Sequence, residues 1–389
     1  MKLKSLLIGS AALAAAATSA QAADPIVVPE PEPMEYVRVC DVYGAGFFYI
    51  PGTETCLKLS GMVRYQMGYS DGDFGDQDGW DKYARGELNI DVRSETEYGT
   101  LGAWIKLRGT SRNGVSQDGD MALIDFDGDG IADPIFLDGL NHGNAYSRGV
   151  NSSGVNLQQA VISLGGLSMG MSDSIWDTGI HGEQDRGFFP YSRVHFIGYN
   201  FAAGNGLTFA LMLEEADQDY DWTPNFVGKA GIAQGWGSAD LYAAYDATAE
   251  EWAIKGIVKA NLTERLFAEA LAQYESGISY YSSNPFDGIV GGLPINPGSE
   301  WALAATLGYK FTPKLTASVG GAYYSKVGHD PMSNLLGGDL DAWNLGTTID
   351  YEIVENFDAK LAVNYTQFDG PAGADLDQWH GFLRFQRNF

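Results

Sequence analysis

Apolar and polar residues alternate along residues 57–69, and this is the clearest pattern of its kind in the chain. Every second position from Leu57 to Tyr69 holds an apolar residue or glycine, and the positions between them are mostly polar and include Lys58 and Arg64. Successive side chains of a strand point to opposite faces, so the segment predicts a strand with one apolar face and one polar face. A soluble sheet turns its apolar face toward a core, whereas a membrane barrel turns it toward lipid and its polar face toward a wet lumen.

Similar segments recur along the chain and predict sixteen strands, most of them nine to thirteen residues long. A tilted strand of this length can cross a bilayer. The predicted strands are 57–69, 82–94, 99–111, 157–165, 167–176, 193–202, 206–214, 225–234, 238–246, 251–260, 265–275, 301–311, 315–325, 341–353, 357–367 and 378–389.

The links between these strands alternate in length. Every even-numbered strand is followed by a short link, at 95–98, 165–166, 203–205, 235–237, 261–264, 312–314 and 354–356. Most odd-numbered strands are followed by longer links, the longest at 112–156, 177–192, 276–300 and 326–340. Outer-membrane barrels have short periplasmic turns and long extracellular loops. We therefore expect an all-β protein, a 16-stranded antiparallel transmembrane β-barrel spanning residues 57–389, with short periplasmic turns, long extracellular loops and both termini on the periplasmic side.

Aromatic residues recur near the predicted strand ends and predict the girdles that barrels place at membrane interfaces. Examples are Tyr69, Trp252, Tyr309, Tyr351 and Tyr365. One cation, Arg387, falls on the predicted lipid face, but it is close enough to the barrel mouth to reach the headgroups.

The N-terminal residues have the pattern of a secretory signal. Residues 1–22 combine two lysines, an apolar run and the small-x-small sequence Ala20-Gln21-Ala22, which predicts cleavage after about Ala22. Beyond it, no window approaches the ~20 uninterrupted apolar residues that a membrane helix needs. Residues 23–35 are rich in Pro and Glu and predict an extended leader. Together with residues 36–56 they are expected to form a periplasmic N-terminal segment, residues 23–56.

The chain is strongly acidic and contains two cysteines. Its formal charge is −26, and removal of Lys2 and Lys4 with the signal makes it −28. Nucleic acid is excluded as a partner because phosphate binding needs a basic surface; the charge favours cations, although the narrowest part of a channel decides its selectivity. In an exported chain, Cys40 and Cys56 predict one disulfide, which the loop-entropy relation values at about 3 kcal/mol.

The sequence CDVYGAGFFYIPGTETCLKLSG, residues 40–61, resembles the N-terminal signature of alphaproteobacterial general porins. The likeness continues to the C-terminal RFQRNF, whose Phe389 looks like the assembly signal of bacterial outer-membrane barrels. The resemblance implies a homotrimer in contact with outer-membrane lipid and lipopolysaccharide. It implies a water-filled channel for passive diffusion of small hydrophilic solutes and ions across the bacterial outer membrane. A substrate-specific channel, for example for sugars, and an adhesive barrel that uses loops 112–156 and 276–300 remain alternatives.

The segment 177–192 is similar by position to the third loop of general porins, which folds into the lumen and narrows it. Its charged residues Asp177, Glu183, Asp185 and Arg186 would then face cations of the barrel wall, and such rings of charge select ions. The alternative is a solvated outer loop. The candidate wall cations are Arg64, Arg85, Arg93, Lys106, Arg108 and Arg384.

The loop 112–156 contains Asp125, Asp127, Asp129 and Asp133 in a DxDxDG pattern. Carboxylates at this spacing, with Gly130 at the bend, are typical of a Ca²⁺ loop. The usual glutamate at the twelfth position is replaced by Phe136, so an acidic surface loop remains the alternative.

No catalytic site is predicted. The string GLSMG at 166–170 matches GxSxG, but that motif needs a strand–turn–helix elbow and a strand follows here. The five histidines are scattered without an i, i+4 pair, so no zinc site is indicated.

Overall fold

The computed structural model describes residues 38–72, 79–113, 121–124, 133–136, 151–152, 154–188, 193–216, 223–285, 289–290, 293–294, 298–327, 340–369 and 375–389. The chain divides into two units, Met1–Arg38 and Val39–Phe389, and every described strand belongs to the second. The predicted signal, residues 1–22, and the predicted leader, 23–35, lie outside the described residues.

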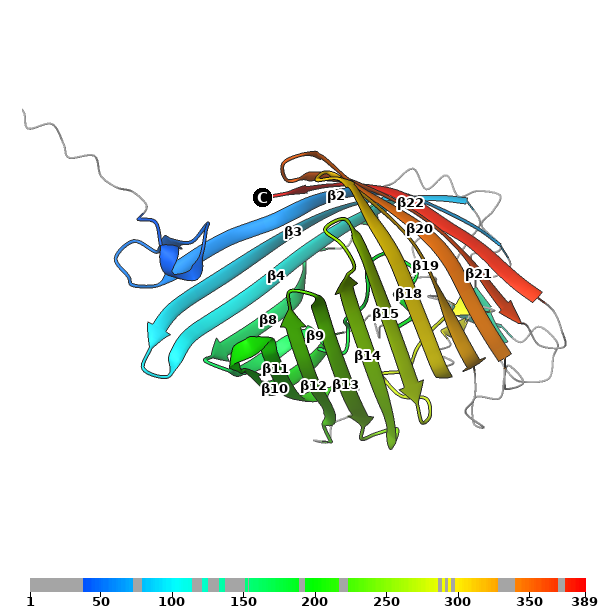
Figure 1. The fold of residues 1–389 in the computed structure, drawn as a ribbon, viewed down its shortest axis with the longest axis horizontal. Helices are drawn as coiled ribbons and strands as arrows, with labels where there is room; N and C mark the ends of the chain where they lie inside the picture. Colours follow the sequence, from blue (N-terminus) through cyan, green and yellow to red (C-terminus); the bar gives the residue numbers. More distant parts are fainter. Residues whose placement is uncertain are drawn as a thin grey trace, which may run out of the picture. The chain divides into compact units, whose positions relative to one another are not determined.

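Sixteen long strands form one antiparallel sheet in which each strand pairs with its neighbours along the chain (Figure 1). This confirms the predicted fold class and strand number, with bounds that differ by a few residues. The strands are β2 (Cys56–Gly72), β3 (Gly79–Thr96), β4 (Gly99–Asn113), β8 (Asn156–Leu164), β9 (Leu167–Asp173), β10 (Arg193–Ala202), β11 (Leu207–Glu215), β12 (Asn225–Gln234), β13 (Gly237–Asp246), β14 (Glu251–Asn261), β15 (Leu266–Glu275), β18 (Ser299–Thr312), β19 (Leu315–Val327), β20 (Leu340–Val354), β21 (Phe357–Asp369) and β22 (Asp375–Asn388).

The sheet closes into a barrel because the last strand, β22, pairs with the first, β2, from Met62 opposite Asn388 to Gly72 opposite Gln378. The terminal residue completes the seam: Phe389 N donates to Gly61 O at 3.0 Å, and Gly61 N donates to Phe389 O at 2.9 Å. Short elements accompany the barrel: β1 (Phe48–Tyr49), β5 (Met121–Ile124), β6 (Asp133–Phe136), β7 (Asn151–Ser152), β16 (Ile289–Val290), β17 (Leu293–Pro294), and the 3-10 helices η2 (Asp41–Tyr43), η4 (Arg186–Phe188) and η5 (Gly204–Gly206). None of the described helices is long and apolar enough to cross a membrane.

The outer face of the barrel is apolar. On β18, the exposed residues Trp301, Leu303 and Leu307 alternate with the buried Ala302 and Ala304. Large apolar side chains of other strands are exposed in the same way, which is the inverse of a soluble sheet and fits a lipid-facing surface. The alternation seen in the sequence therefore places apolar residues outside and polar residues inside.

Aromatic side chains form a girdle at the end of the barrel that carries the long loops. Trp252, Tyr274 and Trp301 lie on neighbouring strands, with ring centroids 5.2 and 4.7 Å apart. At the opposite end, Arg387 is exposed on the outer face and its guanidinium donates to Asn356 O at 3.2 Å. The expected outward position of this cation at the mouth is confirmed.

The short turns contain residues that accept left-handed backbone conformations. Gly165 at φ 58° lies between β8 and β9, and Asn356 at φ 62° lies between β20 and β21. Residues of this kind let two strands reverse direction within a few positions. The N-terminal segment ends in the predicted disulfide between Cys40 and Cys56, which is buried against Phe47, Tyr43 and Tyr49.

Candidate functional site

Four basic side chains line the inner face of adjacent strands, and we call them the basic wall: Lys360 on β21, Arg384 on β22, Arg64 on β2 and Arg85 on β3. The strand register places Lys360 directly opposite Arg384, and Arg64 directly opposite Arg85. Three of these cations were candidates from the sequence. Lys360 was missed, although its alternation with the outward Leu361 and Val363 is a signal that could have found it.

The arginines of the basic wall bond to neutral side chains beside them. Arg64 donates to Gln386 Oε1 from Nε at 2.9 Å and from Nη2 at 2.7 Å. Arg85 Nε donates to Thr110 Oγ1 at 3.1 Å, and Arg384 Nε donates to Gln66 Oε1 at 2.7 Å. These bonds hold the guanidinium groups against the wall without removing their charge.

The other three candidate wall cations lie differently. Arg108 on β4 forms an ion pair with Glu87 at 2.8 Å, and Lys106 lies one inward position along the same strand, opposite Asn89. Arg93 is at the periplasmic end, where it bonds to Asp91 at 2.8 Å and lies over the Phe47 ring beside the disulfide. The structure thus assigns Arg93 to the periplasmic mouth.

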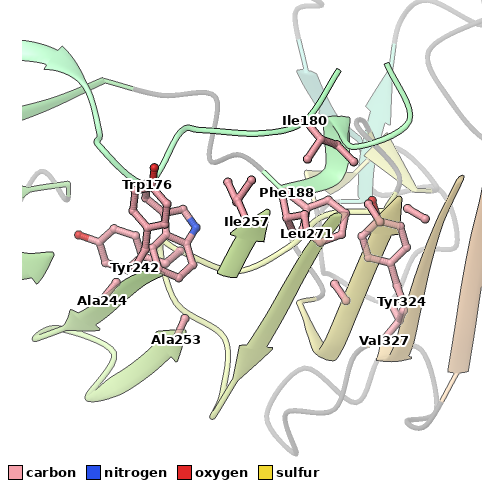
Figure 2. Packing of buried hydrophobic residues seen from close by; sticks show 14 of the residues in the cluster. Trp176, Ile180, Phe188, Tyr242, Ala244, Ala253, Ile257, Leu271, Tyr324 and Val327 are labelled. Atoms are coloured by element: carbon pink, nitrogen blue, oxygen red, sulfur yellow. The ribbon is translucent and has the colours of Figure 1, made fainter. Parts of the chain in front are cut away.

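Residues 174–188, which we call the inner loop, follow β9 and pack against the inside of the barrel wall. The side chains of Trp176 and Phe188 are fully buried (Figure 2). The Trp176 ring meets Tyr242 of β13 edge-on at 6.4 Å, and the Phe188 ring lies 5.2 Å from Tyr324 of β19. Apolar burial of this kind favours a fixed position over a solvated outer loop. Residues 189–192 of the predicted loop lie outside the described residues.

Polar contacts hold the inner loop at its beginning. The fully buried Lys255 of β14 donates from Nζ to the Trp176 carbonyl oxygen, and its ammonium lies 4.7 Å from the Trp176 ring centroid. Ser174 Oγ donates to Glu214 of β11 at 2.7 Å. A buried lysine needs such acceptors, because an unpaired buried charge is very costly.

Further contacts hold the middle of the inner loop against strands farther along the barrel wall. His181 N donates to Glu269 Oε2 at 2.8 Å, Thr306 Oγ1 donates to His181 O at 2.8 Å, and Asn344 Nδ2 donates to Gln184 O at 2.8 Å. These partners belong to β15, β18 and β20, so the loop crosses from one part of the barrel wall to another.

Glu183 is the loop carboxylate that meets the basic wall. Its Oε1 lies 3.4 Å from Lys360 Nζ and 3.9 Å from Arg384 Nη1. Asp350 of β20 extends the same cluster, since it lies 3.4 Å from Lys360 and 3.3 Å from His181. One acidic group of the loop therefore lies beside two cations of the wall, Lys360 and Arg384.

The other two acidic candidates turn away from the basic wall. Asp185 is only 3% exposed, and its Oδ2 accepts a hydrogen bond from Ile180 N at 2.6 Å. Burial raises the pKa of Asp185 to about 6. Burial, together with nearby Asp173, also raises the pKa of Asp177. Arg186, the fourth charged candidate, begins η4.

A second stretch, residues 276–285, also lies inside the barrel; we call it the second inner segment. The sequence predicts an outer loop at 276–300, which includes this stretch, whereas Tyr281 is fully buried and its ring centroid lies 5.5 Å from that of Trp176. Tyr281 Oη donates to Glu214 Oε2 at 3.1 Å. Burial and the neighbouring Glu214 raise the pKa of Tyr281, so the phenol keeps its proton. The sequence signal that could have indicated this burial is the adjacent pair Tyr280 and Tyr281 within a stretch rich in serine and glycine.

The two inner stretches fill one side of the barrel. Inward residues of β12 to β15 are almost fully covered: Val227, Tyr242, Ile257 and Leu271 are at most 2% exposed. The inward cations Arg64, Lys106 and Arg108 of β2 and β4 stay partly exposed. The water-accessible part of the lumen therefore lies along the basic wall and β4.

No group of three or more metal-ligating side chains occurs in the described part of the chain. Residues 125–132, with Asp125, Asp127 and Asp129, lie outside the described residues, and only the backbone of Asp133, the first residue of β6, is described. The Ca²⁺ loop stays a prediction.

Comparisons with known proteins fit this geometry. A family model described as a porin subfamily matches residues 24–382. Porin Omp2a of Brucella suis biovar 1 (strain 1330) is 37% identical over 407 residues, covering 100% of both chains. Porin Omp2b of Brucella abortus (strain 2308) is 36% identical over 412 residues, again covering 100% of both.

Solved structures share the barrel. The outer membrane channel DcaP of Acinetobacter baumannii has a TM-score of 0.62 at 15% identity, covering 88% of this chain and 99% of that chain. A mutant of the Rh. blastica porin has a TM-score of 0.50 at 16% identity, covering 86% of this chain and 100% of that chain. At these identities the likeness concerns the fold alone. The match to the family model over most of the chain shows that this protein belongs to the porin subfamily, and it is a multi-pass β-barrel porin of the outer membrane.

Proposed function

We propose that the inner loop forms the constriction of this outer-membrane porin, and that ions and small hydrophilic solutes diffuse passively past Glu183 and the basic wall. The observation that carries the proposal is the contact of Glu183 with Lys360 and Arg384. It places a loop carboxylate within 4 Å of each of two wall cations, in a barrel of the size that leaves an aqueous lumen.

The distribution of burial supports the same path. The inner loop and the second inner segment cover the wall from β11 to β15, where apolar side chains pack as in a protein core. Charged side chains on the opposite side keep contact with solvent, and charged rings in a pore select ions and polar solutes. Selectivity then depends on a few side chains at the narrowest level and not on the net charge of −26.

We propose further that the protein is a homotrimer whose apolar outer face also contacts outer-membrane lipid and lipopolysaccharide. Membership of the porin subfamily and the exposed apolar side chains of the barrel support this. The mass of the detergent-solubilised protein, corrected for bound detergent, tests it: a monomer at every protein concentration would contradict the trimer.

The test of the channel is the current across a planar bilayer under a salt gradient. We expect ohmic steps of closely grouped size, which arrive in threes if the trimer inserts intact. Replacement of Glu183 or Arg384 should then move the reversal potential in opposite directions. Correctly folded protein that gives no current would refute an open passage, and current with unchanged reversal potentials in both variants would refute this constriction.

A further inference from the structure

We propose that the second inner segment is a strut that fixes the constriction, and that Tyr281 is its main positioning residue. This inference rests on the proposed function for its effect on current. Its structural part, that residues 276–285 hold residues 174–188 in place, can be tested without any current.

The strut contacts the beginning of the inner loop. The Tyr281 ring packs edge-on against Trp176, whose carbonyl oxygen also accepts a hydrogen bond from the ammonium of Lys255. Tyr281 Oη and Ser174 Oγ both donate to the buried carboxylate of Glu214, at 3.1 and 2.7 Å. One carboxylate on β11 therefore ties the inner loop and the strut to the same strand.

The strut also contacts the end of the described inner loop. Asn284 N donates to the carbonyl oxygen of Gly187 at 2.7 Å. Next to Gly187, the fully buried Phe188 packs against Tyr324. A Cβ on Gly187 would come within 2.6 Å of the Asn284 carbonyl oxygen, so the two backbones touch at a point that only glycine allows. The strut thus holds both ends of the loop segment and leaves its middle to meet the basic wall.

The strut is itself firmly held by the barrel. Gln273 Nε2 donates to Tyr281 O at 3.0 Å, and Tyr280 N donates to Asp246 Oδ2 at 2.8 Å. The buried Glu275 accepts a hydrogen bond from Ser283 N at 2.8 Å, and the hydroxyl oxygens of Ser283 and Ser299 lie 2.5 Å apart. These contacts run to residues of β13, β15 and β18, so movement of the strut requires the loss of contacts to three strands of the barrel.

The experiment compares Tyr281→Ala and Tyr281→Phe with the wild-type protein by hydrogen exchange of peptides that cover residues 174–188. Loss of the buried ring should speed exchange of these peptides by about a hundredfold. Loss of the hydroxyl alone should speed it by about tenfold, because Phe keeps the packing against Trp176. Tyr98→Ala, in an exposed periplasmic turn, is the matched control and should leave the exchange unchanged.

The same variants are then recorded in planar bilayers, where a released loop should produce frequent current transients and admit larger sugars. Faster exchange with unchanged current supports the strut and counts against the constriction. Unchanged exchange in a correctly folded Tyr281→Ala protein overturns the strut. If that variant does not fold, Tyr281→Phe decides, because it preserves the packed ring and should still loosen the loop.

Discussion

Replacement of Glu183 by glutamine should make the channel more permeable to anions relative to cations. The substitution keeps the size of the side chain and its capacity for hydrogen bonding, and it removes one negative charge beside Lys360 and Arg384. Because electrostatic potentials add, the potential at the constriction becomes more positive whether or not Glu183 is paired.

The size of the effect follows from Coulomb's law. Two unit charges 4 Å apart interact by about 1 kcal/mol in bulk water, so an ion that passes the carboxylate at that distance changes its energy by about this amount. The change has opposite signs for cations and anions, which gives a difference of about 2 kcal/mol between them, or roughly thirtyfold in their permeability ratio. Mobile salt ions screen the carboxylate over about 10 Å at 0.1 M and weaken this interaction, so we expect a change of about three- to tenfold.

The assay is the reversal potential under a salt gradient, measured for both signs of the gradient. Arg384→Gln is the opposite test and should shift the potential toward cations by a similar amount. Glu264→Gln, in the exposed turn between β14 and β15, carries the same chemical change far from the inner loop and serves as the control. Equal shifts for Glu183→Gln and Glu264→Gln would show a general surface effect and refute the local argument.

Three further outcomes are expected. Arg186→Ala removes a cation from the inner loop and should shift the reversal potential toward cations; identical selectivity would mean that this residue lies away from the ion path. Replacement of Cys40 and Cys56 by serine should lower the free energy of unfolding by about 3 kcal/mol in urea and leave conductance unchanged, because the disulfide is at the periplasmic end. Asp185 has its pKa raised from 3.8 to about 6, so the folded protein binds this proton more tightly than the unfolded chain does. Stability should therefore fall by roughly 3 kcal/mol as pH rises from below 4 to above 6, and Asp185→Asn should lose this part of the pH dependence in unfolding measurements.

The barrel could be predicted from the sequence because its two signals are local. Alternation with a period of two is independent of distant residues, and it places the apolar side chains of β2 or β18 on one face without knowledge of their neighbours. Short links between such segments fix which strands are adjacent. Together these signals gave sixteen strands, their order and the outward position of Arg387.

The contents of the lumen could not be predicted in the same way. The position of the inner loop depends on contacts between residues that are far apart in the sequence. Lys255 and Trp176 are separated by 79 positions, and Asn344 and Gln184 by 160 positions. A loop has no periodicity that shows its inward face, so Asp185 looked equivalent to Glu183. The resemblance to a porin family implied that this loop enters the lumen, but only the folded structure distinguishes Glu183, which contacts the basic wall, from Asp185, which is buried.

The barrel exposes apolar side chains on its outer face, yet it also has a buried apolar core, because the inner loop and the second inner segment pack against one side of its interior. Lipid replaces water on the outer face, so packing there does not distinguish one arrangement of loops from another. Inside, Trp176, Phe188 and Tyr281 bury large rings against β13 to β15 and β19, as residues of a soluble protein would. The cost is lumen area on that side. In return, the packed rings support the loop that carries Glu183, the carboxylate beside Lys360 and Arg384. The packing of the inner loop and the proposed selectivity of the channel therefore depend on the same short segment.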